Sequence, residues 1–177
     1  PEYSTEANAA RKWEVCRGIG RSFGYNRMEH DGTMPTADEL VWMVVDIVAR
    51  GGNLLLNVGP TADGQIPIAQ ATRLLALGWW LRVNGDAIYG TRAGGAGRTE
   101  AGQRVRFTER DGVRYAIVQG AVAGDVVLPE VTAPEGAEVR VLGSPRVVPH
   151  RMIDGALHVH LPDHLPASPA TVLAIAG

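Results

Sequence analysis

The sequence is short of cysteine, of net charge and of long apolar runs. Its 177 residues include one cysteine, Cys16, which excludes an internal disulfide and a metal site built from several cysteines. The net charge of −2 gives no reason to expect attraction to nucleic acid or to an anionic membrane surface. No apolar run approaches the ~20 residues of a membrane-spanning helix. We recognise no signal peptide, so a cytoplasmic and a secreted location are both open.

Apolar residues are abundant enough for a packed core. They make up 45% of the chain, which is typical of globular proteins, and the length suits one ordinary domain or two small ones. The pattern changes at about residue 93. Strand-like and helix-like segments alternate before it, and short strands of period two follow it. We therefore predict two domains, residues 1–93 and 94–177.

Residues 1–93 have the pattern of βαβ units. We expect a strand at 13–19 and a helix behind Thr36-Ala37-Asp38-Glu39, whose spacing is that of a capping box. A second strand is expected within 51–60. A second helix should open at Pro67 and end near residue 85. A complete (β/α)₈ barrel takes ~250 residues, so this region holds about three βα units and cannot close a barrel alone.

The stretch Gly51 to Pro60, GGNLLLNVGP, carries an unbroken apolar triplet between two asparagines. A half-exposed strand would alternate apolar and polar residues, and this one does not. The pattern predicts a parallel strand that is buried on both faces. Asn57 then lies near the carboxyl end of the strand, where α/β proteins place ligand-binding groups.

Residues 94–177 are predicted to form a small antiparallel β-sandwich. The glycine-rich segment 93–97 has the composition of a linker. Asp111-Gly112 is typical of a hairpin turn. Further short strands are expected at 125–128, 138–142, 156–161 and 171–175.

Several side chains are candidates for chemistry, each with a plainer interpretation beside it. Glu14 lies between apolar residues of a strand, so it is paired, at a strand end, or functional. The loop segment Ser22-Phe23-Gly24-Tyr25-Asn26 carries aromatic and amide groups that suit a sugar, although a packed turn would explain it as well. His158 and His160 share one strand face, which is more simply a solvated face than a metal site. The cluster Glu29-His30-Asp31 is expected to be a solvated group of loop charges.

The order of segments resembles one enzyme family. PEY, WEVCRGIGRSFGYN, GGNLLLNVGPTADG and NGDAIYGT follow one another as in the α-L-fucosidases of glycoside hydrolase family 29. The resemblance covers residues 1–93 and continues more loosely beyond them. It implies the last strands of a catalytic (β/α) barrel followed by a β-sandwich, and thus a fold class of α/β plus all-β. The richness in Ala, Gly, Val and Arg hints at a bacterial source.

The resemblance also implies a retaining α-L-fucosidase, which needs two carboxyl groups and no cofactor or metal. No segment matches the family's nucleophilic aspartate, so we expect a fragment. Glu2 of PEY, which would otherwise be a solvated residue near a terminus, resembles the acid/base, and Glu14 is the second candidate. Phe23 resembles the aromatic residue beside the C6 methyl of fucose. Trp13, Tyr25 and Asn57 are further candidates for binding the substrate.

The expected partner is a fucosylated glycan or an aryl fucoside. An incomplete barrel would leave strand edges and apolar faces exposed, so we expect a homo-oligomer, in which Glu2 and Glu14 could come from different subunits. Two other functions stay open. The sandwich could be a non-catalytic carbohydrate-binding or assembly module, or the chain could be a structural remnant that binds no ligand.

Overall fold

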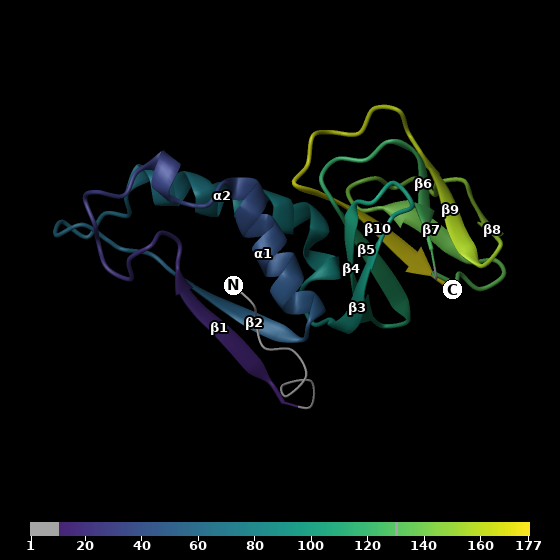
Figure 1. The fold of residues 1–177 in the computed structure, drawn as a ribbon, viewed down its shortest axis with the longest axis horizontal. Helices are drawn as coiled ribbons and strands as arrows, with labels where there is room; N and C mark the ends of the chain where they lie inside the picture. The colour runs from purple at the N-terminus through teal and green to yellow at the C-terminus, as the bar shows by residue number, and fades with distance from the viewer. Residues whose placement is uncertain (1–10, 130) are drawn as a thin grey trace.

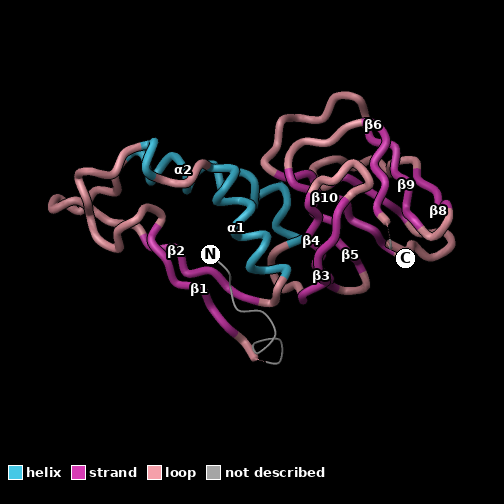
Figure 2. The backbone as a smooth tube through the Cα atoms, in the orientation of Figure 1, coloured by secondary structure: helices cyan, strands magenta, loops and turns pink. Residues whose placement is uncertain are grey.

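The structure, a computed structural model, describes residues 11–129 and 131–177. Figures 1 and 2 show two helices between a narrow pair of strands and a larger body of strands. No helix within the described ranges is long and apolar enough to cross a membrane. The elements form three groups: a two-stranded parallel sheet with its helices, a five-stranded sheet and a three-stranded sheet.

The first group is a βαβ unit. Strands β1 (Trp13–Gly18) and β2 (Gly52–Asn57) pair in parallel, and α1 (Ala37–Ala49) connects them, preceded by the 3-10 helix η1 (Asp31–Thr33). Helix α2 (Ile68–Asn84) follows β2 and continues into the 3-10 helix η2 (Gly85–Ala87). These bounds agree with the predicted order of strand, helix, strand and helix.

Helix α1 begins at the predicted capping box. The Thr36 hydroxyl accepts a hydrogen bond from the Glu39 amide at 3.2 Å, and the Glu39 carboxylate accepts one from the Thr36 amide at 2.7 Å. Hydrogen bonds from the Thr36 backbone and hydroxyl lower the pKa of Glu39 below its ordinary value. The helix ends where Gly51 takes a φ of +81°, a conformation that favours glycine.

The remaining strands form two antiparallel sheets, which together have the layered form of a β-sandwich. In spatial order, the five-stranded sheet consists of β3 (Arg92–Arg98), β4 (Arg104–Arg110), β5 (Val113–Gln119), β10 (Ala170–Ala176) and β7 (Glu138–Val141). The three-stranded sheet consists of β6 (Gly124–Leu128), β9 (Ala156–Leu161) and β8 (His150–Ile153).

The main core lies between these two sheets. Ala116, Val118 and Leu173 of the larger sheet pack in one cluster with Leu157 and Val159 of the smaller sheet. All five side chains are almost completely buried. The alternation predicted for the second half of the chain therefore has its physical cause in this inter-sheet core.

A second core lies on the other face of the five-stranded sheet, where α1 and α2 cover it. Tyr115, Ile117 and Val172 of the sheet pack with Val45 of α1 and Trp80 of α2. Figure 1 shows the resulting order of helices, larger sheet and smaller sheet. The central strands β5 and β10 of the larger sheet are thus buried on both sides, and the helical region and the sandwich share one apolar cluster.

The glycine-rich segment 93–97 is not a linker, which corrects the sequence interpretation. It lies within β3 and pairs with β4, with a shift of register between Ala93 and Ala96. A Cβ atom at Gly94 would come within 2.8 Å of the Phe107 backbone, so the glycine permits this close approach. Strand β8 is also an element that the sequence analysis did not predict.

The prediction that β2 is buried on both faces is wrong for the described residues. Leu54 and Leu56 pack against the cluster beneath the helices, whereas Leu55 is 47% exposed. Strand β2 pairs only with β1, so the sheet has two strands within the described ranges, and no closed barrel forms. The side of the sheet that faces away from α1 is therefore accessible to solvent.

Candidate active site

The candidate site lies at the carboxyl ends of the two parallel strands. Gly18 at the end of β1 is in register with Asn57 at the end of β2, and the Ile19 amide donates a hydrogen bond to the Asn57 carbonyl at 2.8 Å. The loop that leaves β1 and the loop that leaves β2 consequently start side by side. In parallel α/β sheets this is the edge where ligands bind.

Asn57 joins the two loops through its side chain. Its amide nitrogen donates a hydrogen bond to the Phe23 carbonyl. Two residues later the loops touch again, because a Cβ atom at Gly59 would lie 2.6 Å from the Gly24 carbonyl carbon. The side chain of Gln70 on α2 is buried, and its Oε1 accepts a hydrogen bond from the Gly59 amide at 3.0 Å. Phe23 and Asn57, both predicted from the sequence, are thus brought together.

Glu29 anchors the loop that carries Phe23. One carboxylate oxygen accepts hydrogen bonds from the backbone amides of Arg21 and Ser22, both at 2.7 Å. The other oxygen is buried and makes no hydrogen bond within the described residues. A Cβ atom at Gly20 would lie 2.1 Å from that second oxygen, so a side chain there would displace the carboxylate from this position. Sequence reasoning missed this role.

The predicted solvated cluster of loop charges is exposed at His30 and Asp31, as expected, but Glu29 is partly buried and has the anchoring role given above. Besides the role of Glu29, the ring of His30 accepts the Gly32 amide at 3.2 Å and caps η1. The Asp31 carboxylate pairs with Arg73 of α2 at 2.7 Å. All three side chains support the local fold.

The aromatic side chains of this loop are accessible. Phe23 is 59% exposed and Tyr25 is 52% exposed. Phe23 borders a cavity of about 810 Å³ on the α1 side of β1, which also has Arg17, Met34 and Glu39 in its wall. The loop therefore presents the apolar ring of Phe23 beside a hollow with a few charged groups, as ligand sites commonly do.

The two strands have different faces, which separates the other candidates. Glu14 is exposed and stands opposite Asn53, so it shares the solvent-facing side with Asn57. Trp13 points to the α1 side, where its indole lies against Gly52. Trp13 is level with Gly52 and Glu14 with Asn53, so they lie about 16 Å and about 13 Å along the strand from Asn57. The structure thus does not bring Trp13 and Glu14 to the carboxyl edge.

Glu2 lies outside the described residues. Its distance from Glu14 and from Phe23 is therefore not defined, and the proposed catalytic role of both glutamates stays a prediction. Within residues 11–129 and 131–177, no three His, Cys, Asp or Glu side chains gather as a metal site would require.

The histidines of β9 have the surroundings that the sequence suggested. Leu157, Val159 and Leu161 are buried, and His160 lies on the other face with Nδ1 2.8 Å from the carboxylate of Asp125. Both members of this pair are exposed, with 61% of the His160 side chain and 84% of the Asp125 side chain accessible. The pair is thus a solvated surface contact.

Comparison with known proteins places this geometry in a family. The family model described as α-L-fucosidase matches residues 1–86. The plasma α-L-fucosidase of Rattus norvegicus is 39% identical over 140 residues, which cover 76% of this chain and 30% of that protein. The α-L-fucosidase of Dictyostelium discoideum is 46% identical over 82 residues, or 46% of this chain and 18% of that protein. The chain thus spans less than a third of these curated relatives.

Solved structures agree over nearly the whole chain. The α-fucosidase of Thermotoga maritima in complex with a mechanism-based inhibitor superposes with a TM-score of 0.88 at 39% identity, covering 95% of this chain and 40% of that one. The same enzyme in complex with fucose gives a TM-score of 0.87 at 38% identity, covering 97% and 42%. From its sequence, its strand and helix order and these similarities, the chain belongs to the α-L-fucosidases of glycoside hydrolase family 29.

Proposed function

We propose that this chain is the C-terminal part of a retaining α-L-fucosidase that hydrolyses terminal α-L-fucosides. In this proposal, β1, α1, β2 and α2 are the last units of a (β/α) barrel, and residues 94–177 are the sandwich domain that follows it. The observation that carries the proposal is the joined pair of loops at the carboxyl ends of β1 and β2, in which Asn57 holds the Phe23 backbone.

Phe23 has the chemistry that a 6-deoxy sugar requires. Fucose carries a methyl group where other hexoses carry a hydroxymethyl group, and an apolar wall favours it by about 0.8 kcal/mol per buried carbon. An exposed ring on an anchored loop can provide that wall without reorganisation, because Asn57 and Glu29 already fix the backbone on either side of it. We assign Tyr25 a supporting role in the same loop.

The chemistry needs two carboxyl groups ~5–5.5 Å apart, one as nucleophile and one as acid/base. We propose Glu2 as the acid/base, with Glu14 as the second candidate. The sequence has no match to the family's nucleophilic aspartate, so the nucleophile must come from another part of the enzyme or from a second copy. We therefore expect low activity, or none, from the isolated 177-residue chain.

The solvent-facing side of the β1–β2 sheet would face the barrel interior in this proposal. Glu14, Asn53, Leu55 and Asn57 lie on it, and Leu55 is 47% exposed. Because β1 also has an unpaired edge within the described ranges, this side is suited to association with the rest of a barrel or with a second copy. This is the basis for proposing a homo-oligomer of the isolated chain.

The test is release of phenol from an aryl α-L-fucoside by the purified chain, by Glu2→Gln and by Glu14→Gln, with the oligomeric state measured by light scattering. Phe23→Ala tests the sugar contact, and Tyr89→Ala is its matched control, because Tyr89 is also 59% exposed but does not border the Phe23 cavity. Turnover that one Glu→Gln change abolishes in an oligomer supports the carboxylate assignment. Turnover that both changes leave intact contradicts it.

A further inference from the structure

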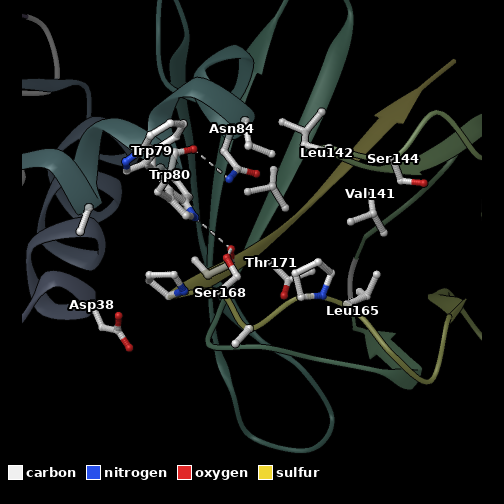
Figure 3. A pocket seen from close by; sticks show the side chains of 18 of the residues that line it. Asp38, Trp79, Trp80, Asn84, Val141, Leu142, Ser144, Leu165, Ser168 and Thr171 are labelled. Carbon is white, nitrogen blue, oxygen red and sulfur yellow. Dashed lines mark hydrogen bonds between the residues drawn. The ribbon is translucent and has the colours of Figure 1, made fainter.

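A second cavity lies where α2 and the start of α1 meet the sandwich, and none of its lining residues lines the Phe23 cavity. Its volume is about 550 Å³, within the range of small-molecule sites. Figure 3 shows its walls: the end of α2, the segment that follows β7, and the segment that precedes β10. It therefore combines side chains from both halves of the chain.

One wall of this cavity is an exposed indole. Trp79 is 63% exposed, whereas its neighbour Trp80 is buried and donates from Nε1 to the Ala170 carbonyl at 3.1 Å. Arg82 lies over the Trp79 ring, 4.9 Å from its centroid, but does not line the cavity. Arg82 therefore covers one face of the indole, and the rest of the exposed ring contributes to the cavity wall.

A buried amide supplies a directional polar group. Asn84 is only 5% exposed, and its Nδ2 donates to the Trp80 carbonyl at 3.1 Å (Figure 3). Its Oδ1 accepts no hydrogen bond from the described residues, although Asn84 lines the cavity. Asn84 Oδ1 is thus an acceptor at the cavity wall that a ligand hydroxyl or amide donor can reach.

The other polar groups of the wall are also acceptors or hydroxyls. Ser168 donates to the Ala170 carbonyl at 2.7 Å, and the Ser144 hydroxyl accepts the Arg146 amide at 3.3 Å. The exposed Asp38 carboxylate stands at the cavity and makes no ion pair within the described ranges. Among the described residues, no Lys or Arg side chain lines the cavity, so a phosphate or sulfate group would find no cation from them there.

We propose that this cavity binds a neutral sugar ring, as a second and non-catalytic carbohydrate site. The ring's C–H face stacks on Trp79, and its hydroxyls donate to Asn84 Oδ1 and to the Asp38 carboxylate. The site differs from a module made of the sandwich alone, because α2 supplies the aromatic wall. It would hold a glycan substrate at a distance from the loops of β1 and β2, and it does not depend on turnover by this chain.

The experiment is a titration of the ¹⁵N-labelled 177-residue chain with lactose and with 2′-fucosyllactose, followed through the indole NH of Trp79 and the side-chain amide of Asn84. We expect both signals to shift in a saturable way. Trp79→Ala should weaken binding about tenfold, whereas Trp79→Phe, which keeps a stacking ring, should retain most of it. Tyr89→Ala is the matched control for an exposed aromatic residue outside the cavity.

Three results would overturn the site. The first is the absence of a saturable shift with either sugar up to about 50 mM, at which even a millimolar site is occupied. The second is sugar binding that Trp79→Ala leaves unchanged. The third is a cavity that binds the apolar dye anilinonaphthalene sulfonate but neither sugar. Phe23→Ala separates this site from the proposed active site, because it should leave the Trp79 shift unchanged. Failure of the fucosidase assay alone would leave this result unaffected.

Discussion

Strands β2 and β5 carry similar apolar runs but have different surroundings. In β5, Tyr115 and Ile117 pack under the helices while Ala116 and Val118 pack between the sheets, so the strand is buried on both faces. In β2, the central leucine of Leu54-Leu55-Leu56 is 47% exposed. An unbroken apolar run therefore marks a strand that is built for two covered faces, whether or not the described chain supplies both covers.

The two strands therefore differ in which parts of the protein must cover them. The sandwich and the helices complete the burial of β5 from within the chain. The β1–β2 sheet is complete only on its α1 side, and its other side is the one for which we propose an additional partner. The stability of the chain should consequently depend strongly on β5 and weakly on the solvent-facing side of β2.

The largest expected effect is the loss of packing in β5. Ile117→Ala removes a completely buried side chain from the cluster beneath the helices and should cost about 2–5 kcal/mol of unfolding free energy. Leu55→Ala, a matched truncation of an apolar side chain on β2, should cost less than about 1 kcal/mol in the isolated chain. Urea unfolding followed by circular dichroism measures both.

The Leu55 result also tests self-association. A large cost of Leu55→Ala that grows with protein concentration would mean that a second copy covers this side of β2. A large cost that does not change with concentration would contradict the exposed position of Leu55, and the contrast between the two strands would fail.

Much of the fold follows from local chemistry. The capping box at Thr36 and the turn at Asp111-Gly112 each have a backbone requirement that few residue types satisfy, and both occur where the sequence predicts them. Strand β3 was missed because its glycines look like a linker. The approach of Phe107 explains Gly94 and Gly97, whereas Gly95 takes a φ of +94°. The exposure of Leu55 could not be predicted, because it depends on which other strands are present.

Some residues of the candidate site could likewise be predicted from the sequence, and others could not. Phe23 and Asn57 could be singled out because an aromatic residue and an amide follow or end apolar strands. Glu29 could not, because its two hydrogen bonds to the Arg21 and Ser22 amides depend on how a loop folds back over seven and eight residues. The only local signal was Gly20, whose missing side chain makes room for the carboxylate.

A smaller effect is expected where α1 is tied to the sandwich. Asp46 of α1 accepts a hydrogen bond from Arg106 of β4 at 2.6 Å, and both side chains are largely buried. Asp46→Asn should cost about 1–3 kcal/mol, because it leaves the guanidinium without its charged acceptor. Asp125→Asn is the matched control: its pair with His160 is exposed, so its cost should stay within about 0.5 kcal/mol. Equal costs would show that the helix does not depend on this link.

The smallest effect concerns the start of α1, the helix that contacts both regions. The pKa of Glu39 lies below its ordinary value of about 4.5 because Thr36 donates hydrogen bonds to the carboxylate. A lowered folded-state pKa adds stability that is fully present above the unfolded pKa and is lost as pH falls through the folded pKa. Glu39→Gln keeps the capping geometry but removes this charge. The melting temperatures of the two proteins should therefore converge as the pH falls from above the unfolded pKa through the lowered folded pKa. Glu135→Gln, at an exposed position without a hydrogen bond in the described residues, should not converge with the parent in this way. A constant difference between parent and Glu39→Gln across this range would mean that the cap acts through its geometry alone.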